Sequence, residues 1–158
     1  MKTFLEFIAE SATPTPEDIK KVMSEIESAF LTQFPNCYLE IEESKGIAHS
    51  IEIKFGLIMN KNELPSSIRL NDPAFHQFII FVGKDGFEAQ ASQGGISVET
   101  DNKYLAMETV KTPFRKTKGN TDKIIKAFKT FTVRLKALVK ENESKIYKRS
   151  MYKDVYFK

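Results

Sequence analysis

The spacing of apolar residues changes twice along this chain, and those changes restrict the fold more than any other feature. From Thr15 to Pro35, and again after Asn120, apolar residues recur every three or four positions, as on one face of an α-helix. From Cys37 to Lys111 apolar and polar residues largely alternate in short segments, which is typical of strands with one buried face. This order predicts an α+β fold: an antiparallel β-meander of about five or six strands with two long helices packed on one face.

The first helix has a clear start signal. Thr15 is a helix-capping residue, Pro16 suits the first helical position, and Asp18 completes a capping-box pattern with Thr15. The helix is expected to end before Pro35, because proline cannot continue it. The stripe predicted to face the core consists of Ile19, Val22, Met23, Ile26, Ala29 and Phe30.

The expected strands are short and are separated by turn signals. Ser44-Lys45-Gly46 separates the two strands of the first expected hairpin, Lys84-Asp85-Gly86 is an expected tight turn, and the polar stretch 60–73 is an expected surface loop. Residues 75–82 are almost continuously apolar, which predicts a central strand. The expected strands are 37–42, 47–57, 75–82, 87–92, 96–99 and 104–111.

The second helix is expected to follow a basic linker at 113–120. Asn120 or Thr121 can cap this helix. A chain of 158 residues is long enough to bury the resulting core in one domain. The residues of this helix predicted to face the core are Ile124, Ile125, Phe128, Phe131, Leu135, Leu138 and Val139.

Charge is unevenly distributed along the chain. The formal net charge is +3, but residues 111–158 contain fifteen Lys or Arg and four Asp or Glu, which is a net charge of +11. Residues 1–110 therefore have a net charge of −8. The basic region predicts sequence-independent contacts with DNA phosphates, and the alternative is a solvated helix face. The candidate nucleic-acid-binding residues are Arg115, Lys116, Lys118, Lys123, Lys126, Arg134, Lys140, Lys148, Arg149 and Lys153.

The residues that could carry catalysis do not form a recognisable motif. His49 and His76 both lie in expected strands, but Phe78 stands where a two-histidine phosphoesterase motif needs Ser or Thr. Cys37 lies on the apolar face of its strand, where a thiol packs as a small hydrophobe rather than acting with His49 as nucleophile and base. We therefore predict a protein that is not an enzyme and that uses no cofactor.

Acidic residues gather in the first expected hairpin. Glu40, Glu42, Glu43 and Glu52 are predicted to share its exposed face. Carboxylates on such a face bind divalent cations through oxygen ligands, but this spacing matches no known metal loop. We expect a solvated acidic face and no metal site.

The first ten residues have a pattern of their own. Phe4, Leu5 and Ile8 share one face at helical spacing, and Phe7 widens that face. The segment, Met1-Lys2-Thr3-Phe4-Leu5-Glu6-Phe7-Ile8-Ala9-Glu10, resembles the capsid-targeting propeptide of the internal head proteins of T4-like bacteriophages. The alternative is an N-terminal helix that docks on the core of the domain.

The resemblance implies a cleavage site. The prohead protease of these phages cuts after a Leu/Ile-x-Glu tripeptide, which Ile8, Ala9 and Glu10 supply, so the expected cut lies before Ser11. The chain would then consist of a leader at 1–10, an α+β domain at 11–144 and a basic, aromatic tail at 145–158. Ile41-Glu42-Glu43 has the same pattern but lies in an expected strand, so we predict that the bond after Glu43 survives.

The resemblance also implies a location and partners. Residues 1–10 would bind the prohead core and the prohead protease, and the chain would lie in the capsid interior with the DNA before it enters the host cytoplasm. There it would bind and inhibit a host defence protein such as a restriction nuclease. The alternatives are a DNA-associated structural component of the prohead core and an enzyme delivered with the DNA. No membrane partner is expected, because no apolar run approaches the roughly 18 residues of a membrane span.

Overall fold

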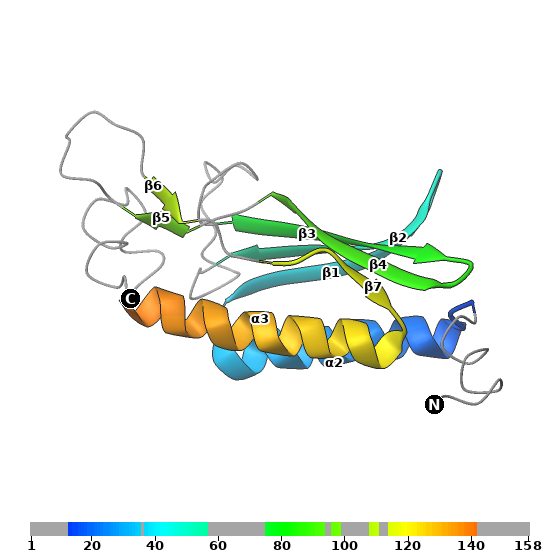
Figure 1. Cartoon of the computed structure of the whole chain (residues 1–158), viewed down its shortest axis with the longest axis horizontal. Helices are drawn as coiled ribbons and strands as arrows, with labels where there is room; N and C mark the ends of the chain where they lie inside the picture. The colour runs from blue at the N-terminus through cyan, green and yellow to red at the C-terminus, as the bar shows by residue number, and fades with distance from the viewer. Residues whose placement is uncertain are drawn as a thin grey trace, which may run out of the picture.

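Two helices lie side by side on one face of a five-stranded antiparallel sheet (Figure 1). The computed structural model describes residues 13–35, 37–56, 75–93, 96–98, 108–110 and 114–141. The helices are α2 (Pro16–Gln33) and α3 (Thr121–Glu141). The sheet contains, in spatial order, β1 (Tyr38–Lys45), β2 (His49–Gly56), β3 (Phe75–Gly83), β4 (Gly86–Gln93) and β7 (Thr117–Gly119). This arrangement confirms the predicted α+β fold.

Helix α2 begins with the capping box that the sequence predicts. The backbone N–H of Asp18 donates to Thr15 Oγ1 at 3.2 Å, and the backbone N–H of Thr15 donates to the Asp18 carboxylate at 2.8 Å. The hydrogen bond from the Thr15 backbone holds the pKa of Asp18 below its usual value. The helix ends at Gln33, before Pro35, as predicted.

The first four strands form the predicted meander, and β3 is the central strand. Lys84 and Asp85 form the tight turn between β3 and β4, and Gly86 follows with a φ of +132°. That angle disfavours any residue with a side chain. A Cβ at Gly86 would also lie 2.7 Å from the carbonyl oxygen of Gly119, so glycine lets β7 approach the hairpin closely.

Three details of the strand prediction are wrong. The expected linker at 113–120 includes Thr117–Gly119, which pairs with β4 and forms the edge of the sheet. Ile47, expected at the start of a strand, lies fully exposed in the turn between β1 and β2. Of the last two expected strands the structure describes β5 (Ile96–Val98) and β6 (Glu108–Val110), which pair with each other in a separate sheet instead of extending the meander. Alternation predicts a strand but does not specify its neighbour.

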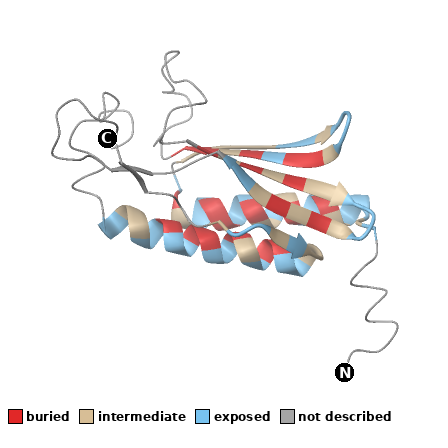
Figure 2. Ribbon diagram, turned by 45° about the horizontal axis from the view of Figure 1, so that its top comes forward, coloured by how far each residue is buried: buried red, intermediate tan, exposed pale blue. Residues whose placement is uncertain are grey.

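The core lies between the sheet and the two helices, where buried residues of both layers face each other (Figure 2). Aromatic rings dominate it. The ring centroids of Phe30 and Phe55 are 4.7 Å apart, and those of Phe78 and Phe131 are 5.1 Å apart. Burial of one such ring contributes about 2 kcal/mol. The predicted core-facing residues that are buried are Ile19, Val22, Ile26, Ala29, Phe30, Ile124, Ile125, Phe128, Phe131 and Leu135, while Met23, Leu138 and Val139 are partly buried.

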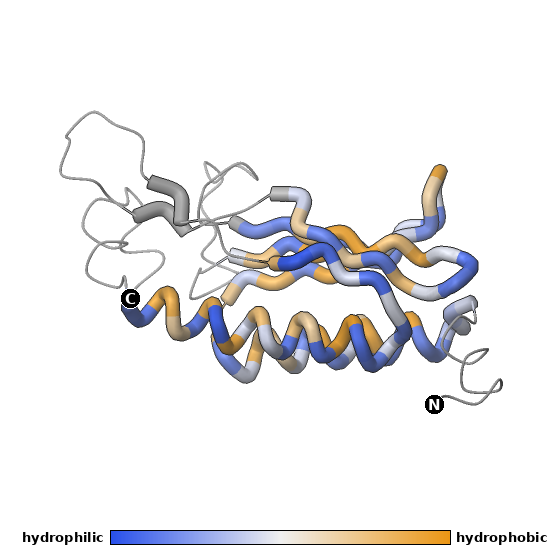
Figure 3. Tube along the Cα trace, viewed as in Figure 1, coloured by the Kyte–Doolittle hydropathy of each residue, from blue (hydrophilic) through white to orange (hydrophobic). Residues whose placement is uncertain are grey.

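The strands present alternating hydropathy (Figure 3), and most polar positions of β1 and β2 lie on the face turned away from the helices. Register places Glu42, Glu52 and Ile79 side by side on that outer face. The two edges of the sheet differ in the helix beside them. Strand β1 contacts α2, and β7 contacts α3.

The predicted leader and tail, residues 1–10 and 145–158, lie outside the described residues. Shortly after the predicted cut, the Thr13 hydroxyl donates to the carbonyl oxygen of Lys84 at 2.7 Å and ties this part of the chain to the β3–β4 turn. The Ile41-Glu42-Glu43 tripeptide lies in β1, paired with β2, so its strand assignment is confirmed. A protease would have to detach β1 before it could cut after Glu43.

Candidate polyanion-binding groove

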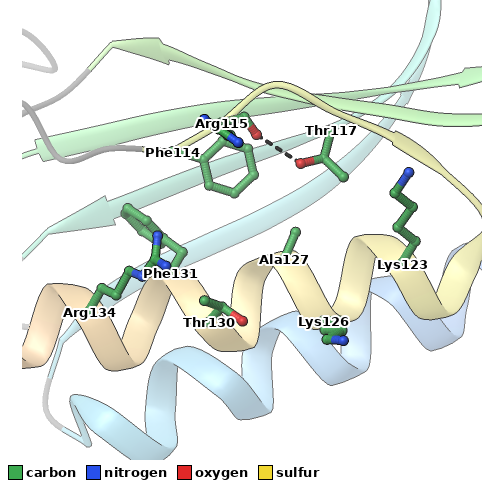
Figure 4. Close-up of a pocket in the computed structure, with 9 residues that line it drawn as sticks. All are labelled: Phe114, Arg115, Thr117, Lys123, Lys126, Ala127, Thr130, Phe131 and Arg134. Atoms are coloured by element: carbon green, nitrogen blue, oxygen red, sulfur yellow. Dashed lines mark hydrogen bonds between the residues drawn. The ribbon is translucent and has the colours of Figure 1, made fainter.

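A groove with a volume of about 280 Å³ runs between α3 and the segment that leads into β7 (Figure 4). Four cationic side chains line it, and no carboxylate does. The cations are Arg115, Lys123, Lys126 and Arg134, and the other lining residues are Phe114, Thr117, Ala127, Thr130 and Phe131.

Helix α3 supplies one wall of the groove. Asn120 caps this helix, because its Oδ1 accepts from the backbone N–H of Lys123 at 3.0 Å. Lys123, Lys126, Thr130 and Arg134 are spaced by three and four residues, so they share one face. They span about 16 Å along the helix axis at the standard rise per residue. The opposite side of α3 is fixed in the core, so this row of side chains has a rigid support.

The segment before β7 supplies the other wall. The Phe114 ring packs 4.7 Å from the Phe128 ring and 5.5 Å from the Phe131 ring, measured between centroids. This packing fixes the backbone beside Arg115, whose carbonyl oxygen accepts from Thr117 Oγ1 at 2.8 Å. In Figure 4, Lys123 and Arg134 extend from α3 toward this segment at the two ends of the groove.

The four groove cations have no carboxylate partner among the described residues. Two of the other predicted DNA contacts, Lys116 and Lys118, do have a carboxylate partner. Lys116 Nζ lies 2.7 Å and Lys118 Nζ 3.7 Å from the carboxylate of Glu88, on the outer face of the sheet. The hydrogen bond from Lys116 lowers the pKa of Glu88. These two lysines therefore face a carboxylate, whereas the groove cations can accept an external anion.

The predicted set of ten contacts thus divides into separate groups. Arg115, Lys123, Lys126 and Arg134 meet in the groove, and Lys140 is exposed in the last turn of α3. Phe114 and Thr130 also line the groove but were not among the predicted contacts, although the helical spacing around Lys126 is a signal for Thr130. The remaining predicted contacts, Lys148, Arg149 and Lys153, lie outside the described residues.

The two histidines do not converge. His76 is 2% exposed, and its ring lies among those of Phe55, Phe78 and Phe131. Burial lowers the pKa of His76 to about 4. In the register of β2, His76 lies opposite Phe55, and His49 lies at the other end of the strand, about 20 Å away at the usual rise per residue. A two-histidine phosphoesterase site is therefore not formed.

Cys37 and His49 do not form a nucleophile–base pair either. Cys37 immediately precedes β1, whereas His49 pairs with Lys45 at the far end of that strand. The thiol packs against the core, and burial raises the pKa of Cys37 to about 12. A thiol with this pKa stays protonated and unreactive at neutral pH.

The predicted acidic cluster is divided between the two faces of the sheet. Glu40, Glu42 and Glu52 share the outer face, but Glu43 lies opposite Ile51 on the helix-facing side, 3.6 Å from Nε2 of His49. The expectation that all four carboxylates share one face is therefore wrong, because neighbouring residues of a strand point to opposite faces. Within the described ranges, no three His, Cys, Asp or Glu side chains are close enough to hold a metal ion.

The chain matches no protein-family model, no curated protein and no solved structure. In the part of the chain that the structure describes, neither helix is long and apolar enough to cross a membrane.

Proposed function

We propose that this chain is an internal head protein of a T4-like bacteriophage, carried into the prohead by residues 1–10 and packaged with the DNA as a chain that begins at Ser11. The sequence pattern of residues 1–10 supports the proposed targeting to the prohead. The groove supports the association with DNA, because four cations line it without a carboxylate partner among the described residues.

The groove suits phosphates rather than bases. Arg115 and Arg134 can each donate two parallel hydrogen bonds to one phosphate, while Lys123 and Lys126 act as point charges. Contacts of this kind carry no sequence information, so the proposed binding is sequence-independent. Four neutralised phosphates on duplex DNA predict a slope of about −3.6 in a plot of log affinity against log salt concentration.

Binding to a random-sequence duplex over a range of salt concentrations tests the groove. The double variant Lys126→Gln, Arg134→Gln should reduce the slope to about −1.8, because two phosphate contacts are lost. Lys20→Gln with Lys84→Gln removes the same charge from exposed positions that do not line the groove, and should leave the slope near that of the wild type. Equal effects of the two double variants would show that only net charge matters.

The intact mass of the protein from purified virions tests the proposed packaging and the cleavage before Ser11. We expect a chain that begins at Ser11 and is uncut after Glu43, because β1 is paired there. A chain that still begins at Met1, or absence of the protein from virions, would contradict the proposed packaging and processing.

A second candidate function is inhibition of a host defence protein, such as a restriction nuclease, after injection. The acidic character of the β1 and α2 edge favours it, because residues 16–45 contain seven Asp or Glu and three Lys or Arg, a net charge of −4. Such an edge repels DNA and is available to a protein. A stoichiometric complex with a nuclease from the host, together with loss of its activity, is the expected result.

A further inference from the structure

A second groove, with a volume of about 350 Å³, lies between β1 and α2 at the sheet edge opposite β7. Its apolar lining comes from Leu31 on α2, from Cys37 just before β1, and from Leu39 and Ile41 on β1. Leu31 is 37% exposed, so part of its side chain is open to a partner at this groove. Strand β1 is the outermost strand, and no described strand pairs with its other side. Backbone groups on that side are therefore available to a further strand.

The rim of this groove is acidic. Glu27, Glu40 and Glu42 line it, and no cationic residue does. Glu40 is partly compensated, since it accepts from the Tyr38 hydroxyl and lies 3.6 Å from Lys54 Nζ. Glu42 instead lies directly opposite Glu52, and no described cation is within ion-pair distance of it. Like charges in this position destabilise a sheet, so a cation from outside would relieve the repulsion.

We propose that this edge binds an extended segment of a partner protein in which apolar residues alternate with Lys or Arg. The segment would add to the sheet as a sixth strand, about 4.8 Å from β1. Side chains on one face of the added strand would meet Leu31, Leu39 and Ile41. Side chains on the other face would lie beside Glu40 and Glu42, where lysine or arginine is favoured.

A second copy of this chain fits the edge less well than a basic segment does. Antiparallel pairing of β1 with β1 would bring the Glu40 and Glu42 carboxylates of the two copies together, and like charges across a strand pair are destabilising. The site is independent of the phosphate groove, because the two lie on opposite edges of the sheet. It would supply a surface for the second candidate function without depending on that function.

The test uses the full chain labelled with ¹⁵N and an eight-residue peptide that alternates valine with arginine. We expect saturable binding, with shift changes and slowed amide exchange along Tyr38–Lys45. A peptide of the same composition, with four valines followed by four arginines, should bind at least about tenfold more weakly because it cannot place the two kinds of side chain on opposite faces. Equal affinities for the two peptides, changes located away from β1, or dimerisation of the chain would overturn the proposal.

Two variants examine the two halves of the site. Glu42→Gln should weaken binding by about threefold to tenfold through the lost charge, and Leu31→Gln by a similar factor through the lost apolar contact. Their matched controls are Glu17→Gln and Val133→Gln, both exposed and outside the groove, which should bind the peptide as the wild type does. Full affinity in both site variants would contradict strand addition here.

Failure of this proposal is distinguishable from failure of the DNA proposal. The double variant Lys126→Gln, Arg134→Gln should lose salt-dependent DNA binding and keep full peptide affinity. Loss of peptide binding in that variant would mean that the peptide is not bound at the β1 edge.

Discussion

The two edges of the sheet carry opposite charge, although both are built from one strand beside one helix. Residues 16–45, which form α2 and β1, have a net charge of −4. Residues 114–141, which form β7 and α3, contain nine Lys or Arg and two Asp or Glu, a net charge of +7. Where the two helices meet, charges are paired: Lys21 lies 3.7 Å from Asp122, and Lys129 lies 3.2 Å from Glu25.

The distance between the edges decides what this difference means. Four strand spacings separate β1 from β7, which amounts to about 19 Å. That exceeds the Debye length of about 8 Å at physiological ionic strength, so charges on the two edge strands are largely screened from each other, although α2 and α3 form ion pairs where they meet. A chain with a small overall charge can therefore bind an anion at one edge and a cationic partner at the other. Three changes test how far the edges are independent.

The largest effect is expected from the core that both edges share. Phe128 lies on α3 within 6.3 Å of Phe30 on α2, measured between ring centroids, and its replacement by alanine should lower the free energy of unfolding by about 4 kcal/mol. Urea denaturation measures this loss. Val133→Ala on the same helix, at a side chain that is 56% exposed, should change it by less than about 0.5 kcal/mol. Loss of order confined to the α3 edge in Phe128→Ala would show that the edges fold separately.

A medium effect is expected from pH and should come from the centre of the sheet rather than from either edge. The pKa of His76 is about 4 in the folded chain, whereas its reference value, taken for the unfolded chain, is 6.5. Between pH 6.5 and pH 5, therefore, the His76 side chain is protonated mainly in the unfolded chain, and this favours unfolding. The free energy of unfolding should therefore fall by about 2 kcal/mol between pH 7 and pH 5. Denaturation in urea at pH 7, 6 and 5 measures this fall.

Two matched histidine variants show whether His76 causes that pH dependence. His76→Gln stays neutral and should remove most of the fall between pH 7 and pH 5, while His49→Gln should retain it. The carboxylates with lowered pKa values, Asp18, Glu40 and Glu88, lose their contribution only below this window, as pH falls through their folded pKa values. An unchanged fall in His76→Gln would locate the sensitivity at the charged edges.

The smallest effect is expected where the sheet carboxylate Glu88 compensates the basic edge. Glu88→Gln should free Lys116 and Lys118, raise the affinity for duplex DNA by about twofold to fivefold, and steepen the salt slope by about one. Glu52→Gln makes the same charge change on the same face, away from these lysines, and should have little effect. Equal effects of the two variants would show that DNA binding responds to total charge, and would contradict the independence of the two edges.

The candidate site was only partly predictable from the sequence. Helical spacing places Lys123, Lys126 and Arg134 on one face of α3, so three groove cations could be grouped in advance. The separation of Arg115 from Lys116 and Lys118 could not, because it depends on the pairing of β7 with β4, which brings Glu88 beside the two lysines. The groove along β1 could not be predicted either, because it depends on how α2 packs beside β1, which brings Leu31 and Ile41 into the lining of one groove.

By itself, the sequence determined the two helices, their caps, their buried stripes and the first four strands, because these depend on residues a few positions apart. It also determined that the charge is divided along the chain. Only the tertiary structure decided that residues 117–119 join the sheet, that β5 and β6 pair apart from it, and that the two charges lie on opposite edges. Those outcomes depend on which strands pair, and pairing is a contact between residues far apart in the chain.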